Sequence, residues 1–139
     1  MTALSKQGIL LLLGMLLALA IPMRAGAEGP VLQVLTVKVK GDSNAYLTML
    51  KQSKLKSILT RLGATNVRIF RATLAGPESG LIFVSTEYPN LETFGKATAK
   101  AAGDAELQKM VKEMDASGIR EIVSRSLLED VTPADEAKP

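Results

Sequence analysis

The chain contains no cysteine, no histidine and no tryptophan, and these absences exclude most kinds of reactive centre. Without cysteine and histidine it cannot build the usual zinc or iron–sulfur sites, a Ser-His-Asp triad or a Cys-His dyad, and it lacks the common axial ligands of haem. We therefore expect no metal site and no cofactor. At 139 residues, the chain has the length of one domain.

The first 27 residues have the pattern of a secretory signal peptide. Lys6 precedes an apolar run from Ile9 to Ile21, and the small residues Ala25-Gly26-Ala27 follow that run. The run is 13 residues long and ends at a proline, whereas a membrane span needs about 20 apolar residues. We expect cleavage after residue 27, export to the periplasm or the extracellular space, and no stable membrane span afterwards.

Removal of this leader changes the charge balance of the chain. The formal net charge is +3, but Lys6 and Arg24 belong to the leader, and what remains has 15 basic and 14 acidic residues. Nucleic-acid-binding proteins concentrate Lys and Arg on one face. The nearly balanced mature chain therefore predicts no nucleic acid partner.

The mature chain alternates strand patterns with helix patterns. Apolar and β-branched runs predict strands at residues 31–40, 64–75, 81–88 and 119–128. Between the second and third strands, Gly76 to Gly80 is rich in turn residues and predicts a hairpin loop. Residues 133–139 have too little apolar surface to pack, so we expect a mobile tail after a domain spanning 28–132.

Two amphipathic stretches predict the helices. The first runs from about residue 44 to Gly63, with a break near Gln52-Ser53, and is capped by Asp42 or Ser43. The second begins after Asn90 and runs to Gly118, and it is interrupted at Gly103 and capped again by Asp104.

This order of elements predicts an α+β, ferredoxin-like βαββαβ fold. Right-handed crossovers place both helices on one face of a four-stranded antiparallel sheet. Each strand nevertheless carries apolar residues on both faces, for example Leu32 and Val34 against Leu35 and Val37. A sheet with one face in water alternates more cleanly. We therefore expect a second copy of the chain to cover the bare face, giving a homodimer.

From residue 71 to 114 the chain reads RATLAGPESGLIFVSTEYPNLETFGKATAKAAGDAELQKMVKEM. In its element order, and at positions such as Tyr88-Pro89 and Gly103-Asp104, it resembles the dimeric α/β-barrel superfamily, which includes NIPSNAP-like, antibiotic-biosynthesis monooxygenase-like and EthD-like proteins. The resemblance extends from Val31 to about Val131. It implies a sheet-to-sheet homodimeric barrel with a pocket in each subunit between the sheet and the helices or loops. Members that degrade haem use histidine and tryptophan, which are both missing here.

Polar residues within the predicted strands are the candidate ligand residues. Arg71, Ser85, Glu87, Glu121 and Arg125 are all odd-numbered, so those on one strand are expected to point the same way. Two arginines near a carboxylate can hold an anionic ligand, and a buried glutamate with a raised pKa can act as a base. Cross-strand ion pairs are the alternative interpretation.

The candidate ligand pocket comprises Arg71, Ser85, Glu87, Tyr88 and Arg125, and none of these is assigned a catalytic role. Tyr88 either lines the mouth of the pocket or packs against the helix that follows it. We interpret the protein as a non-catalytic module that binds a small apolar or anionic molecule or acts through its dimer. The alternative is a cofactor-independent, monooxygenase-like enzyme in which Arg71, Glu87 and Arg125 place and deprotonate an acidic or phenolic apolar substrate.

Basic residues also form a stripe on each predicted helix. The interpretations are a face in contact with an anionic membrane surface or a solvated helix face, and the sequence favours the second. The stripes comprise Lys51, Lys54, Lys56 and Arg61 on the first helix and Lys96, Lys100, Lys109 and Lys112 on the second.

Overall fold

A computed structural model of the chain describes residues 29–132. The predicted signal peptide, at residues 1–27, and the predicted tail, at 133–139, lie outside these described residues. The elements are β1 (Val31–Val39), α2 (Ser43–Gln52), α3 (Leu55–Leu62), β2 (Asn66–Arg71), a short 3-10 turn η1 (Gly76–Glu78), β3 (Ile82–Tyr88), α4 (Leu91–Gly103), α5 (Ala105–Ser117) and β4 (Arg120–Glu129).

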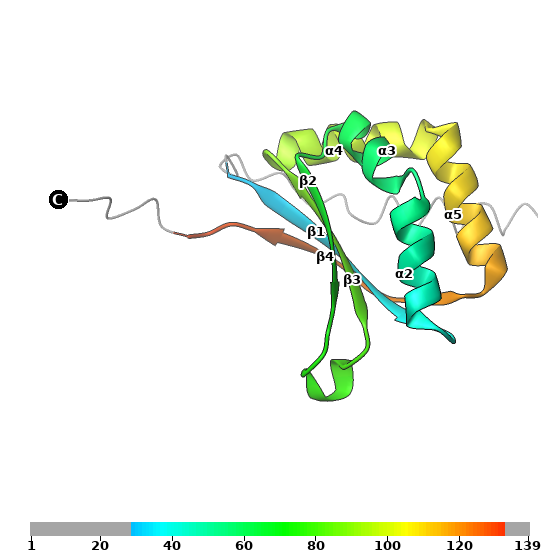
Figure 1. The fold of residues 1–139 in the computed structure, drawn as a ribbon. Coiled ribbons are helices and arrows are strands. Elements are labelled where there is room, and N and C mark those ends of the chain that lie inside the picture. The colour runs from blue at the N-terminus through cyan, green and yellow to red at the C-terminus, as the bar shows by residue number, and fades with distance from the viewer. Residues whose placement is uncertain (1–28, 133–139) are drawn as a thin grey trace, which may run out of the picture.

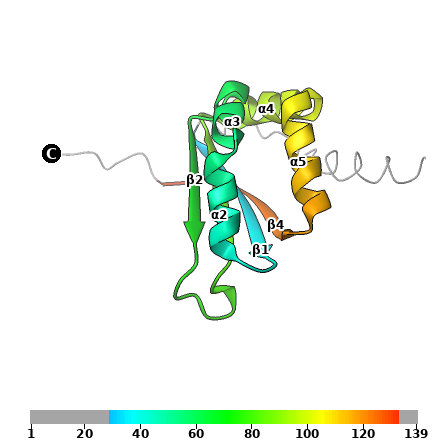
Figure 2. The same ribbon diagram turned by 45° about the vertical axis from the view of Figure 1, so that its right-hand side comes forward.

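The strands form one four-stranded sheet in the order β2-β3-β1-β4, and each neighbouring pair is antiparallel. The α2–α3 and α4–α5 helices lie on the same side of this sheet, as Figures 1 and 2 show from two directions. The structure therefore confirms the α+β, ferredoxin-like prediction, with each predicted helix present as two shorter ones. Within residues 29–132, no helix is both long enough and apolar enough to cross a bilayer.

Three helices, α2, α4 and α5, begin where the side-chain oxygen of the capping residue accepts a hydrogen bond from a free backbone amide, as the sequence indicates. Each cap accepts a bond of 2.8 Å: Asp42 from the amide of Asn44, Asn90 from Thr93, and Asp104 from Leu107. Gly63 ends α3 with φ of 122°, and Gly118 ends α5 with φ of 65°. Glycine adopts such positive φ values without a Cβ clash.

The predicted break in the first helix lies at Ser53 and Lys54. The Ser53 hydroxyl donates a hydrogen bond of 2.7 Å to the carbonyl of Leu50 and accepts one of 3.3 Å from the amide of Leu55. One side chain thus satisfies backbone groups at the end of α2 and at the start of α3. α3 can therefore take a different direction from α2 without leaving those backbone groups unpaired.

The core lies between the helices and one face of the sheet, in two clusters. One contains Val31, Ile58, Leu62, Ala64, Tyr88, Ala97 and Leu107. The other contains Val37, Tyr46, Leu50, Ile82, Val84 and Met114. Every strand residue in these clusters projects toward the helices, because side chains alternate between the two faces of a strand. The strand residues between them project from the opposite side.

The side of the sheet away from the helices is called the open face below. Register and alternation assign to it Leu32, Val34, Thr36, Phe70, Phe83, Ser85, Glu87 and Leu128. Thr36 and Ser85 are buried by their neighbours in the sheet, whereas Phe70 is 50% exposed and Leu128 is 51% exposed. No helix of the described residues covers this face (Figure 1).

Candidate functional site

The sheet register separates the five candidate pocket residues. Ser85 pairs with Val34 and Glu87 pairs with Leu32, so both lie on the open face. Arg71 pairs with Ile82, and Arg125 pairs with Leu35, so both belong to the face that carries the helices. These two arginines also lie on opposite edge strands. The register therefore does not bring Arg71, Glu87 and Arg125 together on one face of a single subunit.

A β-bulge in β4 explains part of this error. Thr36 pairs with Ser124 and Val37 with Ile122, which leaves Val123 as an extra residue without a partner on β1. An extra residue reverses the alternation of side chains on either side of it. Glu121, which pairs with Lys38, therefore projects from the open face, although Arg125 belongs to the helix face. The two residues do not share a face as their odd numbers suggested.

Two of the candidate residues have structural partners within the subunit. Arg71 donates a hydrogen bond of 2.7 Å from Nη2 to the side-chain oxygen of Asn44, which ties the end of β2 to the start of α2. Tyr88 is buried, and its ring lies edge-on to Phe94 with the ring centroids 5.4 Å apart. Burial raises the pKa of the Tyr88 phenol above its usual value. Tyr88 thus packs on the following helix, which was one of the two expectations for it.

The described residues do not contain a group of three or more Asp and Glu side chains that could hold a metal ion. One acidic side chain with a shifted pKa is Glu92, where a hydrogen bond from Lys96 lowers the pKa, and this pair is exposed on α4. Such a pair stabilises the charged form of the carboxylate. Glu92 is therefore not a carboxylate of raised pKa that could act as a base.

Two hollows of the described surface lie around the α2–α3 break. A depression of about 720 Å³ runs along α3 and is lined by Ser53, Lys54, Lys56, Ser57, Thr60 and Arg61. A smaller cavity of about 220 Å³, called the notch below, lies between the break and the edge strand β2. The notch is lined by Leu50, Lys51, Ser53, Leu55, Lys56, Val67 and Ile69.

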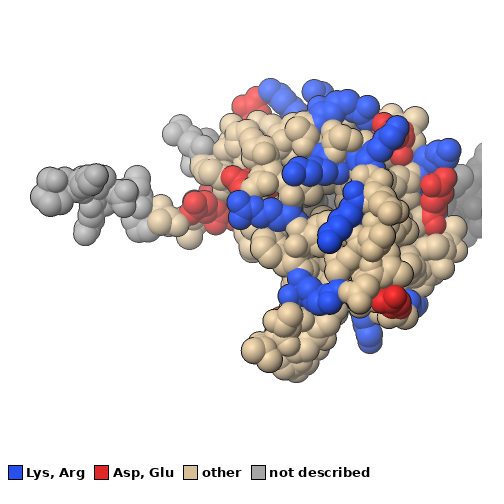
Figure 3. Space-filling model, viewed as in Figure 1, with Lys and Arg blue, Asp and Glu red and all other residues tan. Residues whose placement is uncertain are grey.

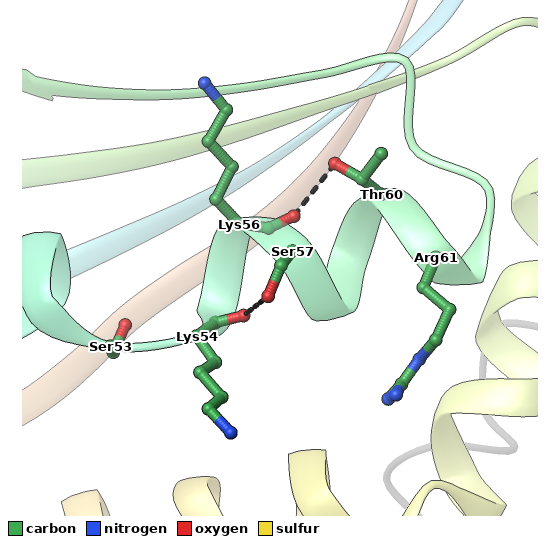
Figure 4. Close-up of a pocket in the computed structure, with 6 residues that line it drawn as sticks. All are labelled: Ser53, Lys54, Lys56, Ser57, Thr60 and Arg61. Atoms are coloured by element: carbon green, nitrogen blue, oxygen red, sulfur yellow. Dashed lines mark hydrogen bonds between the residues drawn. The ribbon is translucent and has the colours of Figure 1, made fainter.

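The long side chains of the depression diverge, as Figure 4 shows. Lys54 and Arg61 point to one side of α3, and Lys56 points to the other side, toward the strands (Figure 4). Arg61 lies 2.7 Å from the carboxylate of Asp104, and Lys54 lies 3.5 Å from that of Glu106. These two cations are therefore neutralised by α5 and its cap. Lys56 instead lines both the depression and the notch.

Comparison with known proteins finds the same fold in solved structures. A NIPSNAP family protein of unknown function from Agrobacterium tumefaciens matches with a TM-score of 0.60 at 13% identity, over 76% of this chain and 94% of that chain. A second NIPSNAP family protein from the same organism matches with a TM-score of 0.57 at 15% identity, over 81% and 97%. No family model and no curated protein matches the sequence.

A third similar structure is that of an enzyme. SnoaB, a cofactor-independent oxygenase from Streptomyces nogalater, matches with a TM-score of 0.55 at 11% identity, over 76% of this chain and 96% of that chain. The described residues therefore have the α+β, ferredoxin-like fold of NIPSNAP family proteins and of this oxygenase. These structures confirm the ferredoxin-like fold that the resemblance seen in the sequence implies.

Sequence reasoning missed the notch. It recognised Lys51 and Lys56 only as members of a helix stripe, and it placed Val67 and Ile69 only within the predicted strand at residues 64–75. The available signal was the break at Gln52-Ser53, because a break in a helix opens space beside the strand on which the helix packs. The residues of the notch are brought together only by tertiary packing.

Proposed function

We propose that the chain is an exported, non-catalytic binding module that forms a homodimer through the open face of its sheet and takes a small apolar or anionic molecule. The observation that carries this proposal is the composition of the open face. Leu32, Val34, Phe70, Phe83 and Leu128 contribute apolar side chains to it from all four strands. Contiguous apolar surface of this kind is typical of an interaction site.

A second copy of the chain fits this face better than a partner of different chemistry. Thr36 and Ser85 lie among the apolar side chains and are themselves buried, and Glu87 and Arg68 lie toward the ends and edge of the face. A central apolar area with charged residues around it is the usual arrangement of an interface. A twofold axis through the middle of the face would pack the apolar patch of one copy against the same patch of the other, as in an isologous dimer.

Sedimentation equilibrium of the purified chain tests the homodimer. We expect two subunits for the unaltered chain and one for Val34→Asp, because the substitution buries an unpaired carboxylate at the centre of the interface. Phe70→Ser should weaken the dimer less, since Phe70 lies on an edge strand. Leu74→Asp is the matched control, because Leu74 is 99% exposed and lies outside the sheet. An unaltered chain that stays monomeric at high concentration contradicts the proposal.

A cofactor-independent oxygenase is the second candidate function, and the similarity to SnoaB supports it. In that case Arg71, Glu87 or Arg125 would serve the reaction. Oxygen uptake with a polycyclic phenol is the measurement. We expect no uptake above the buffer rate, and we expect Arg71→Ala and Glu87→Ala to remain folded with at most a loss of stability. Uptake that Glu87→Ala abolishes without loss of folding would instead establish the enzyme.

A further inference from the structure

The notch between the α2–α3 break and β2 combines an apolar wall with two cationic side chains. We propose that it binds a small amphiphilic anion, that is, a short apolar body carrying one carboxylate or a similar anionic group. This inference rests on the proposed binding function and supplies the site and the ligand class that the function leaves open.

The wall of the notch is apolar on two sides. Leu50 and Leu55 line it from the ends of the two helices, and Val67 and Ile69 line it from β2. Val67 and Ile69 remain partly exposed, because β2 is an edge strand and the helices separate above it at the break. The volume is about 220 Å³, which exceeds the ~150 Å³ of an apolar cavity that accepts a benzene ring. A short hydrocarbon body therefore fits.

Lys51 and Lys56 supply the positive charge. Both line the notch and are exposed, and neither forms an ion pair with any carboxylate of the described residues. Residues 43–77 contain six lysine and arginine residues and not one aspartate or glutamate. Figure 3 shows the resulting concentration of Lys and Arg side chains over α3 and the adjoining part of the sheet. An anion entering the notch therefore meets positive charge without a competing carboxylate.

The two other cations of the depression, which could compete for the same anion, are already engaged. Lys54 and Arg61 point away from β2 and pair with Glu106 and Asp104 (Figure 4). Lys56 points toward the strands, on the side of α3 where the notch lies (Figure 4). The helix pair thus divides its basic residues into a structural pair facing α5 and a ligand pair facing the sheet edge.

Neither the apolar wall nor the positive charge of the notch is enough to bind a ligand by itself. Exposed lysines hold a small hydrated anion weakly, because water and salt screen the charge. A small apolar wall releases only the water that covers it. A ligand that is both anionic and apolar gains from the attraction of the lysines and from the burial of apolar surface together. Octanoate has this chemistry. Octanol and inorganic phosphate each retain one of the two properties.

Amide NMR titration of the purified chain is the experiment. We expect octanoate to shift the amides of Leu50, Leu55, Val67 and Ile69, octanol to shift them at higher concentration, and inorganic phosphate to leave them in place. We expect Lys51→Gln/Lys56→Gln to weaken octanoate binding roughly fivefold or more, since two charge interactions are lost. Lys100→Gln/Lys112→Gln is the control, because it removes two exposed lysines of α4 and α5 and should leave the affinity unchanged.

Each outcome decides the inference. Shifts confined to the notch that the first variant weakens and the control does not weaken support it. An equal loss of octanoate affinity in both variants overturns it. Amide shifts centred on the open face, or the absence of any shift, also overturn it. Co-sedimentation with phosphatidylglycerol vesicles, in a chain that ignores octanoate, would overturn it in favour of a lipid surface. Sedimentation of the same samples separates this test from the dimer: a dimer without octanoate binding refutes only the notch, and a monomer that binds octanoate refutes only the assembly.

Discussion

Arg61 and Asp104 join the two helical halves of the molecule, with Nη2 of Arg61 2.7 Å from Oδ2 of Asp104. The other carboxylate oxygen of Asp104 accepts the amide of Leu107 and so caps α5. The side chain of Asp104, which is 15% exposed, therefore both caps α5 and pairs with Arg61. The cap is expected to contribute more to stability than the ion pair, because Arg61 is about half exposed and water screens its charge.

Substitutions at Asp104 separate these two contributions. We expect Asp104→Ala to lower the free energy of unfolding by about 1–2 kcal/mol, since both cap and ion pair are lost. Asp104→Asn retains a side-chain acceptor for the cap and should cost less than ~1 kcal/mol, similar to Arg61→Ala. Urea unfolding followed by circular dichroism measures all three. Arg61→Ala costing as much as Asp104→Ala would contradict the order of the two effects.

Removal of the Tyr46 hydroxyl should stabilise the protein. Tyr46 is completely buried, and its Oη has no hydrogen-bond partner among the described residues. A buried polar group without a partner costs free energy, so we expect Tyr46→Phe to raise the free energy of unfolding by about 1 kcal/mol. Tyr46→Leu is the comparison, and should be destabilising because it leaves a cavity. A loss of stability in Tyr46→Phe would show that the hydroxyl is satisfied in solution.

The stability of the protein should fall at alkaline pH through Tyr88. Burial raises its folded-state pKa above the ordinary value of 10.0, so the unfolded chain releases this proton at lower pH than the folded chain. The contribution is fully present below about pH 10 and is lost as the pH rises toward the folded-state pKa. We expect Tyr88→Phe to keep its packing on Phe94 and to flatten this decline. Chemical unfolding of both proteins from pH 8 upward is the measurement, and parallel curves would contradict it.

Three glycines should respond differently to alanine. At Gly63, φ is 122° and an added Cβ would lie 3.3 Å from Cγ2 of Thr93, so backbone strain and crowding act together. At Gly118, φ is 65°, and within residues 29–132 no atom beyond its two chain neighbours lies within 4 Å of an added Cβ, so only the left-handed backbone opposes alanine. We expect Gly118→Ala to cost about 1 kcal/mol and Gly63→Ala to cost more. Gly103→Ala, at the last residue of α4 and with open space around an added Cβ among the described residues, should be neutral or stabilising. Thermal unfolding ranks the three.

Local patterns in the sequence were enough to predict the helices and strands and most of the residues at which they end. Asn90, Asp104 and Gly118 are visible as helix boundaries because capping depends on a few neighbouring residues. The order of elements then limits the sheet to the observed topology. Expectations that depend on local chemistry were therefore confirmed.

The candidate site depended on information that is not local. Odd numbering placed Glu121 and Arg125 on one face, but the extra residue Val123 reverses the alternation between them. No pattern in the strand marks that residue as a bulge. The pairing of β2 and β4 with the central strands similarly decided that Arg71 and Arg125 lie on opposite edges. Such register is fixed by packing across the whole sheet.

The bulge at Val123 changes which residues of β4 face the helices. Before it the even-numbered residues, such as Ile122, face the helices, and after it the odd-numbered residues, such as Arg125, do. If Val123 stayed and paired with β1 as an ordinary strand residue, either the segment before it or the segment after it would turn over, exchanging water-facing side chains for core-facing ones. Deleting Val123 would instead restore strict alternation and leave both segments on their present faces. A related chain with the same sheet can therefore lack this one residue between Ile122 and Ser124, because the pairings of those two residues with Val37 and Thr36 are those of a regular ladder.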